Sequence, residues 1–195
     1  MSETNSAPSG GQQADLLDVV LSEITGVVQR VEREDIRRLT DVLAGAPRIF
    51  AAGEGRSGFM AKAFAMRLMH LGLPVHVIGE STTPSVQRGD VLVAISGSGT
   101  TTGTVRVAQQ TVTVGAAVHA VTTDPDSPLA TLAATVLLLP AATKYRRPGE
   151  SETVQPLSSL FDQVTHIALD VVCLLLAQRQ GVDNVAAAAA HANTE

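Results

Sequence analysis

The sequence predicts an α/β fold, a three-layer sandwich built on a doubly wound, five-stranded parallel sheet. Two observations predict it. Short apolar runs recur along the chain, as expected for strands buried on both faces, at residues 48–52, 75–78, 91–95, 116–121 and 135–139. Stretches with helical periodicity separate several of these runs, and glycine-rich loops follow the first and the third. A chain of 195 residues is long enough to bury a sizeable core as one domain.

The chain begins with small and polar residues, and we expect a disordered tail over residues 1–13. One domain is then expected over residues 14–195. From Ala14, apolar residues recur every three or four positions and predict a first helix. A second helix is predicted over 34–44, where the following Gly45 ends it.

Further helices are predicted after the first and third strands, over residues 57–71 and 101–114. Ser127-Pro128 is typical of a helix N-terminus. After a polar loop at 141–156, a long helix is predicted over 157–178. Because that helix is apolar on more than one side, we expect it to contact a partner subunit as well as its own sheet.

Composition excludes several classes of protein. The chain has 19 acidic and 14 basic residues, for a net charge of −5, which argues against non-specific binding to nucleic acid or to an anionic membrane. A single cysteine, Cys173, excludes an intramolecular disulfide framework and fits a reducing compartment. With neither a signal-peptide pattern nor an apolar run long enough to span a bilayer, a soluble cytoplasmic protein is expected.

Two glycine-rich loops carry the functional signal, GEGRSG at residues 53–58 and SGSGTT from Ser96. Each follows a predicted strand and precedes a helix, which is where doubly wound folds bind ligands. Glycines let backbone N–H groups approach an oxyanion, and the helix N-terminus adds partial positive charge. The hydroxyl side chains available to a phosphate monoester are Ser57, Ser96, Ser98, Thr100 and Thr101.

These loops have other possible roles. A glycine-rich turn between strand and helix is often purely structural, and GEGRSG alone is a weak signal. SGSGTT lacks the Gly-Lys-Ser/Thr of a Walker A loop and the three-glycine spacing of dinucleotide-binding folds. The two loops together favour phosphate binding over nucleotide binding.

Several segments of the chain resemble those of a known protein family. The segments GEGRSG, AFAMRLMHLG, GESTTP, GDVLVAISGSGTT, DSPLATLA, PLSSLFDQ and the ending HANTE follow one another from residue 53, within a resemblance that runs from about residue 15 to the end. They resemble the sugar isomerase (SIS) domain family and, within it, the 6-phospho-3-hexuloisomerases. The resemblance implies reversible conversion of D-arabino-3-hexulose 6-phosphate to fructose 6-phosphate through an enediolate. It also implies a homotetramer without metal or organic cofactor, acting beside hexulose-6-phosphate synthase in the ribulose monophosphate pathway of formaldehyde fixation.

The resemblance also implies a set of substrate-binding residues. The phosphate is expected on the hydroxyls of Ser57, Ser96, Ser98 and Thr101, and on the backbone N–H groups of Gly97, Gly99 and Thr100. Arg56 is expected to hold a sugar hydroxyl or the phosphate. Its alternative role is an ordinary surface ion pair.

The expected base departs from the family. The family carries glutamate in a GSLFEQ-like segment, whereas this chain has SSLFDQ and therefore Asp162. Aspartate is shorter by one methylene, about 1.5 Å of reach. The alternatives are a shifted backbone that compensates, a base elsewhere, weak activity, or an aspartate that merely favours the helix N-terminus.

Three further residues are catalytic candidates. His191 matches the histidine of the family's ending and is expected to assist from another subunit, unless the ending is a disordered tail. His70 either faces the site or caps its helix, and Glu80 is a second candidate base. His166 lies four residues from Asp162 and from Asp170, and we interpret this stripe as a solvated or inter-subunit face and not a metal site.

The sequence leaves two alternative functions open. One is another aldose–ketose isomerase of phosphosugars, which the narrower motifs disfavour. The other is a non-catalytic sugar-phosphate sensor. Such sensors join the SIS domain to a helix-turn-helix module, for which this chain has no basic helix. Asp162 is the feature that favours loss of catalysis.

Overall fold

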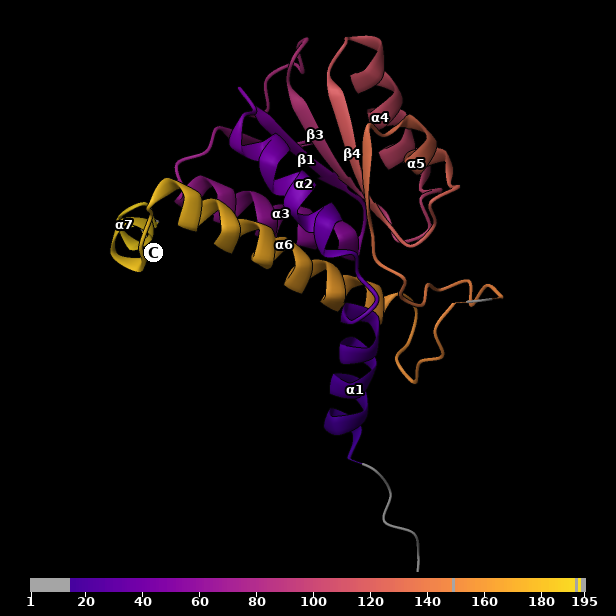
Figure 1. Cartoon of the computed structure of the whole chain (residues 1–195). Coiled ribbons are helices and arrows are strands. Elements are labelled where there is room, and N and C mark those ends of the chain that lie inside the picture. Colours follow the sequence, from indigo (N-terminus) through magenta and orange to yellow (C-terminus); the bar gives the residue numbers. More distant parts are fainter. Residues whose placement is uncertain (1–14, 149, 192, 194–195) are drawn as a thin grey trace, which may run out of the picture.

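Five parallel strands form the centre of the computed structural model, which describes residues 15–148, 150–191 and 193 (Figure 1). The strands are β1 (Ile49–Gly53), β2 (Val75–Val77), β3 (Val91–Ile95), β4 (Ala117–Thr122) and β5 (Thr135–Leu138). Their order in the sheet is β2-β1-β3-β4-β5, and every neighbouring pair is parallel. The predicted doubly wound sheet is confirmed. The tail predicted over residues 1–13 lies outside the described residues.

Side chains alternate between two apolar cores, one on each face of the sheet. In β1, Ile49 and Ala51 join one core, while Phe50 and Ala52 join the other. β3 lies at the middle of the sheet and is buried along its whole length. Strands that are covered on both faces read as continuous apolar runs, which is why they were visible in the sequence.

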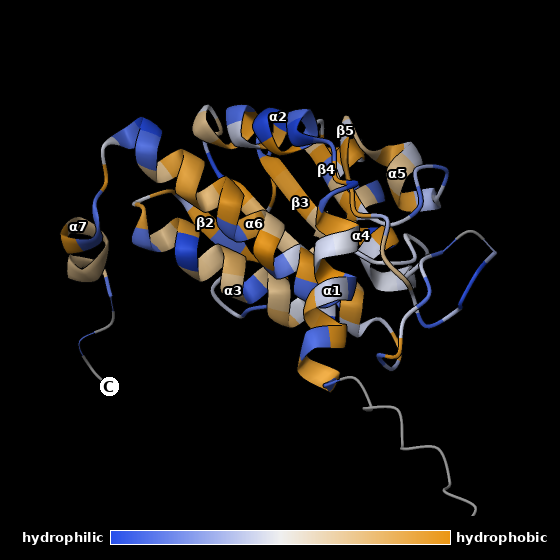
Figure 2. Cartoon of the chain, turned by 60° about the horizontal axis from the view of Figure 1, so that its bottom comes forward, coloured by the Kyte–Doolittle hydropathy of each residue, from blue (hydrophilic) through white to orange (hydrophobic). Residues whose placement is uncertain are grey.

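Helices cover both faces of the sheet. The larger core packs against α1 (Leu16–Val28), α2 (Arg33–Ala44), α3 (Arg56–His70) and α6 (Ser159–Gln180). On the other face lie α4 (Thr102–Thr113) and α5 (Pro128–Leu132). Ser127 caps α5 as predicted, since its hydroxyl accepts a hydrogen bond from the N–H of Ala130. The colouring of Figure 2 shows the apolar strands between these layers.

The strand order reverses between β1 and β3, and this reversal positions the site. From β1 the chain passes through α3 to β2, and from β3 it passes through α4 to β4 on the other side. The register pairs Gly53 with Ile95, so both strands end at the same level. The two glycine-rich loops therefore lie next to each other, at the topological switch point where doubly wound folds bind ligands.

The long helix α6 begins two residues later than predicted. Leu157 has a φ of 54°, which is incompatible with a right-handed helix, and Ser158 takes the N-cap position. By length and hydropathy alone α6 could cross a membrane, with a mean of 1.7 over its most apolar window. More than half of that window is buried inside the protein, however, and α6 packs across α2 and α3 as a core helix.

One short helix was absent from the sequence prediction. α7 (Asn184–Ala189) follows α6, and the carboxylate of Asp183 accepts a hydrogen bond from the N–H of Ala186 at its N-terminus. The alanine run has high helix propensity, and the aspartate supplies the cap that starts it.

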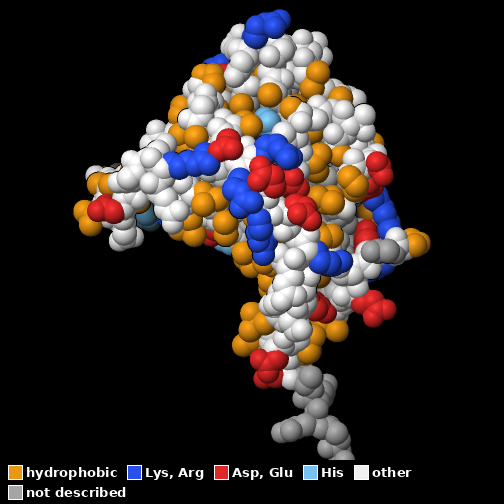
Figure 3. Space-filling view, viewed as in Figure 1, with side chains coloured by type: hydrophobic (Ala, Val, Ile, Leu, Met, Phe, Trp, Pro, Cys, Tyr) orange, Lys and Arg blue, Asp and Glu red, His pale blue; other side chains and the backbone are white. Residues whose placement is uncertain are grey.

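Some apolar side chains remain exposed within one chain. α1 extends away from the body (Figure 1), and Leu16, Leu17 and Leu21 on it are more than half exposed. On α6, Ile167 and Leu174 are also exposed. By contrast, basic and acidic side chains are intermixed in the region of α2, where Figure 3 shows no extended field of one sign.

A buried ion pair joins the amino-terminal ends of β1 and β3. The guanidinium of Arg48 donates two hydrogen bonds to the carboxylate of Asp90, whose side chain is 4% exposed. The N–H of Gln87 also donates to this carboxylate, at 2.6 Å. Burial by itself raises the pKa of Asp90, but the hydrogen bonds from Arg48 and Gln87 outweigh it and leave the pKa lowered.

We predict that Asp90→Asn lowers the free energy of unfolding by about 2 kcal/mol at pH 7, measured by urea denaturation. The pKa of Asp90 is lower in the folded state than in the unfolded state. The stability that its ionised carboxylate contributes is therefore fully present above the unfolded pKa of about 3.9, and it is lost as pH falls through the folded pKa. Glu34→Gln is the matched control, since its pair with Arg37 is exposed. Equal losses of stability in the two variants would contradict a stabilising role for the Arg48–Asp90 pair.

Candidate functional site

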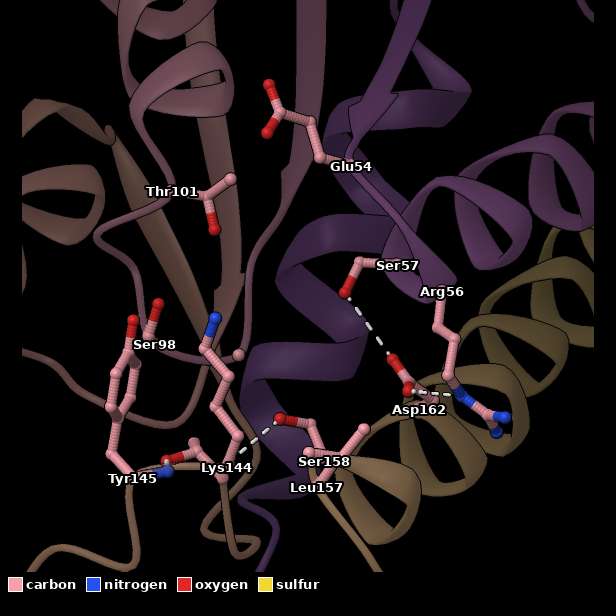
Figure 4. A pocket seen from close by; sticks show the side chains of 12 residues that line it. Glu54, Arg56, Ser57, Ser98, Thr101, Lys144, Tyr145, Leu157, Ser158 and Asp162 are labelled. Atoms are coloured by element: carbon pink, nitrogen blue, oxygen red, sulfur yellow. Dashed lines mark hydrogen bonds and ion pairs between the residues drawn. The ribbon is translucent and has the colours of Figure 1, made fainter.

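A cavity of about 250 Å³ opens at the carboxyl ends of β1 and β3 (Figure 4). Both glycine-rich loops, the loop after β5 and the start of α6 line it. The lining residues are Glu54, Arg56, Ser57, Gly97, Ser98, Thr101, Thr143, Lys144, Tyr145, Leu157, Ser158 and Asp162. Segments separated by up to about a hundred residues in the chain thus meet in one place.

Three helices start at this cavity. Arg56 is the first residue of α3, Thr101 is the N-cap of α4, and Ser158 is the N-cap of α6. Their unpaired N–H groups and the positive ends of their dipoles converge on the same space. Such an arrangement binds anions.

The SGSGTT loop has a conformation that requires glycine at its centre. Gly99 has a φ of 63°, and a Cβ built there would lie 2.0 Å from the hydroxyl oxygen of Ser127. The carbonyl of Gly99 accepts a hydrogen bond from the N–H of Leu129 at 3.0 Å, which ties the loop to α5. This close packing holds Ser98 and Thr101 at the cavity.

The predicted phosphate-binding residues divide into two groups. Ser57, Gly97, Ser98 and Thr101 line the cavity. Ser96 is 2% exposed, and its hydroxyl lies 2.9 Å from that of Thr101, so it orients a residue that lines the cavity. Gly99 and Thr100 belong to the same turn but do not line the cavity, and the exposed Thr100 donates from its hydroxyl to Ser98 at 2.9 Å.

Asp162 lies in the first turn of α6 and is 2% exposed. Its carboxylate accepts a hydrogen bond from Nε of Arg56 at 2.9 Å, and a longer one from the hydroxyl of Ser57 at 3.4 Å. Burial raises the pKa of Asp162 and outweighs the lowering effect of Arg56 and Ser57. A carboxyl group with a raised pKa at a ligand cavity is suited to accept and return a proton.

Arg56 forms an ion pair, which the sequence left open as the alternative to a role in ligand binding. Its partner, however, is the candidate base, and Arg56 itself lines the cavity. The guanidinium carries five N–H donors, of which one is used on Asp162. The remaining donors are available to a ligand.

A second carboxylate at the cavity was not predicted from the sequence. Glu54 extends toward the start of α4, on the side of Thr101 and away from Asp162 (Figure 4). A Cβ at Gly103 would lie 1.6 Å from Oε1 of Glu54, so only glycine at this position leaves room for the carboxylate. The sequence signal that could have identified Glu54 was its position in the GEGRSG loop, two residues before Arg56.

The loop after β5 supplies the other residues that sequence reasoning missed. Thr143, Lys144 and Tyr145 line the cavity, as do Leu157 and Ser158 just before α6. The basic run KYRR was the available signal. A polar loop far from both glycine-rich loops in sequence gives no indication of where it folds.

His70, His191 and Glu80 do not line this cavity within one chain. His70 is at the far end of α3, fourteen residues or about 20 Å from Arg56. Its ring stacks on that of His191, with centroids 5.2 Å apart. Glu80 forms an ion pair with Lys62 at 2.7 Å. A catalytic role for any of them stays a prediction and requires a second copy of the chain.

Two further histidines lie away from the cavity. His119 is buried in β4, its Nδ1 lies 2.7 Å from the hydroxyl of Thr135, and burial lowers its pKa. His166 and Asp170 form an exposed pair on α6, with 3.6 Å between Nε2 and Oδ2. Within the described part of the chain, no group of three His, Cys, Asp or Glu side chains is arranged to hold a metal ion.

Comparison with known proteins identifies the family. The model of the SIS domain family matches residues 42–172. This chain belongs to the SIS domain family. The match spans the sheet from just before β1, both glycine-rich loops and most of α6, so the matched region contains the cavity described above.

This SIS protein has similar relatives over most of its length. It is 41% identical to a 3-hexulose-6-phosphate isomerase of Mycobacterium gastri, covering 92% of this chain and 89% of the relative. It is 36% identical to a Bacillus subtilis protein of the same name, covering 90% and 95% respectively.

Solved structures agree with the fold. A crystal structure from Methanococcus jannaschii, for which the function of 3-hexulose-6-phosphate isomerase was inferred, has a TM-score of 0.81 at 28% identity. The alignment spans 92% of this SIS protein and 99% of the Methanococcus jannaschii chain.

We predict that Gly99→Ala weakens binding of inorganic phosphate about tenfold or more, measured by calorimetry, because the added Cβ collides with Ser127 and displaces the loop. Gly181→Ala is the matched control. Gly181 has a similar φ of 66° with no atom within 4 Å of an added Cβ. Both variants should lose about 1 kcal/mol of stability through backbone strain, and Gly99→Ala should lose more because of the collision with Ser127. Unchanged phosphate binding by Gly99→Ala would contradict the anion site.

Proposed function

We propose that this SIS protein is an isomerase that interconverts D-arabino-3-hexulose 6-phosphate and fructose 6-phosphate through an enediolate, without metal or organic cofactor. The observation that carries the proposal is a buried carboxyl group of raised pKa beside an anion-binding cavity where three helices begin. The names of the relatives support the choice of substrate. Residues 14–195 then act as one isomerase domain.

The phosphate group occupies the side of the cavity formed by the SGSGTT loop. Ser98 and Thr101 donate hydroxyl hydrogen bonds there, and backbone N–H groups at the start of α4 add to them. Ser57 at the start of α3 completes the hydroxyl set. Binding the non-reacting phosphate fixes the sugar relative to the base, so remote binding energy contributes to the rate.

Asp162 carries the proton. Its carboxylate removes the proton from C2 of the 3-ketose, which leaves a C2–C3 enediolate, and the resulting carboxylic acid returns the proton to C3. The hydroxyl proton at O2 transfers to O3 in the same isomerisation, so that the carbonyl ends at C2. N–H groups of Arg56 that are not used on Asp162 stabilise the negative oxygens of the enediolate.

The shorter aspartate constrains where the sugar lies. Because its carboxylate stays close to α6 and is held there by Arg56 and Ser57, C2 and C3 must approach the start of that helix. Leu157 and Ser158, which precede α6, line this part of the cavity. The sugar chain then lies between the phosphate loop and α6.

The same protein is proposed to act as a cytoplasmic homotetramer beside hexulose-6-phosphate synthase in the ribulose monophosphate pathway. Exposed apolar side chains on three helices support association, namely Leu16, Leu17, Leu21, Met66, Met69, Ile167, Val171 and Leu174. In such an assembly His191, His70 or Glu80 of one copy can approach the cavity of another. Sedimentation of a monomer at micromolar concentration would contradict association.

We predict that Asp162→Asn lowers kcat for fructose 6-phosphate formation by about a hundredfold or more, since asparagine cannot accept a proton. A coupled assay of fructose 6-phosphate measures it. Asp170→Asn, two turns along the same helix and half exposed, is the matched control and should leave kcat unchanged. Full activity of Asp162→Asn would remove this residue from the mechanism. Tight binding of fructose 6-phosphate by a wild-type chain without turnover would favour a sensor.

A pH profile tests the coupling of Arg56 to the base. Activity requires ionised Asp162, so kcat/KM falls as pH drops through its pKa, above the ordinary aspartate value of about 3.9. Arg56→Gln removes the cation that lowers this pKa, and we predict that the acidic limb moves to higher pH. Ser98→Ala is the control, because it should raise KM without moving the limb. An unmoved limb in Arg56→Gln would contradict the coupling.

A further inference from the structure

The loop that contains Lys144 lines the cavity and is held to the segment just before α6 by hydrogen bonds. Arg146 donates hydrogen bonds to the carbonyl oxygens of Thr143 at 2.7 Å and Leu157 at 2.9 Å, and so joins the two ends of the loop. It also bonds the carbonyl of Gln155. Arg146 and Leu157 both have positive φ, at 47° and 54°. Strained backbone of this kind persists where surrounding contacts hold it, and it clusters at functional sites.

Lys144 is held at both its backbone and its side chain. Its N–H donates to the hydroxyl of Ser158 at 3.1 Å, which ties it to the start of α6. Its amine lies 5.0 Å from the centroid of the Tyr145 ring, within cation–π range. Figure 4 shows the side chain extending into the cavity, with the amine toward Ser98 and Thr101 and away from Arg56.

The charges at the cavity leave Lys144 available for an anion. Arg56 and Asp162 neutralise each other through their ion pair, and the other lining carboxylate, Glu54, extends toward Gly103 of α4 and not toward Lys144. Among the described residues that line the cavity, Lys144 is then the cation without a carboxylate partner. A phosphate monoester approaches with nearly two negative charges at neutral pH. Hydroxyls and backbone N–H groups alone would leave that charge uncompensated by any full positive charge.

We propose that Lys144 is the cation that binds the substrate's phosphate group, acting from the loop after β5 while the SGSGTT loop supplies the neutral donors. This inference rests on the proposed function for the identity of the ligand as a sugar phosphate. A lysine ammonium is a compact charge with three donors on a flexible stem, so it can turn from the Tyr145 ring to phosphate oxygens. Lys144 thereby discriminates phosphorylated from unphosphorylated sugars.

The chain offers a sharp test because it contains two lysines, Lys62 and Lys144. Lys62 is an internal control, since it is similarly exposed but pairs with Glu80 and does not line the cavity. Both are acetylated with limiting reagent, and mass spectrometry of chymotryptic peptides gives each rate. Inorganic phosphate and fructose 6-phosphate are the probes, compared with sodium chloride at equal ionic strength. We expect the acetylation of Lys144 alone to slow several-fold. Equal slowing of both lysines, or slowing of neither, overturns the proposal.

Kinetics provide the second measurement. Lys144→Met should raise KM for the sugar phosphate about tenfold or more while kcat changes less, and Lys144→Arg should recover part of the loss because it keeps the charge. Lys62→Met should change neither constant. An unchanged KM in Lys144→Met overturns the proposal.

The two proposals can fail separately. Protection of Lys144 by inorganic phosphate in a chain that does not turn over fructose 6-phosphate would support Lys144 as the phosphate cation and contradict the isomerase. Isomerase turnover without protection of Lys144, and with normal KM in Lys144→Met, would support the isomerase and contradict the role of Lys144.

Discussion

The parallel pairing of β1 with β3 is the constraint on which the candidate site depends. Their register ends both strands at the level of Gly53 and Ile95, so the two crossover loops leave the sheet side by side. α3 and α4 then depart toward opposite faces, and both leave their N-terminal N–H groups at the same cavity. The candidate anion site is therefore a consequence of topology, with glycine, serine and threonine at a position where helix N-termini supply partial positive charge.

α6 adds the chemistry to that position. Its first turn places a carboxylate beneath the cavity, where burial favours the protonated form and Arg56 and Ser57 favour the ionised form. Because the two influences oppose each other, the pKa of Asp162 depends on both the packing around α6 and the placement of α3. The ion pair also engages Arg56, so that among the described lining residues Lys144 is the cation without a carboxylate partner. In the proposed function, the positive charge for the ligand comes from a loop and the base lies on a helix.

Most of the fold could be predicted from the sequence because its signals are local. The strands are covered on both faces and appear as apolar runs, and β3 was predicted with its observed bounds. Boundaries were missed where a backbone angle decides them, as at Leu157 with its positive φ before α6. α7 was missed because a short alanine run has no amphipathic pattern, and the cap from Asp183 became evident only in the structure.

The sequence by itself determined the doubly wound sheet, because buried strands appear as local apolar runs. It also predicted two candidate phosphate-binding loops and, through the family resemblance, Asp162 as the candidate base, since each of these lies in a contiguous motif. Only the tertiary structure decided that Glu54, Lys144 and Tyr145 line the same cavity, that Ser96 supports Thr101 from behind, and that Arg56 pairs with Asp162. It also placed His70 against His191, far from the cavity of the same chain. The physical reason is that these relations join segments about a hundred residues apart, and contacts at that range depend on how the sheet and its helices pack.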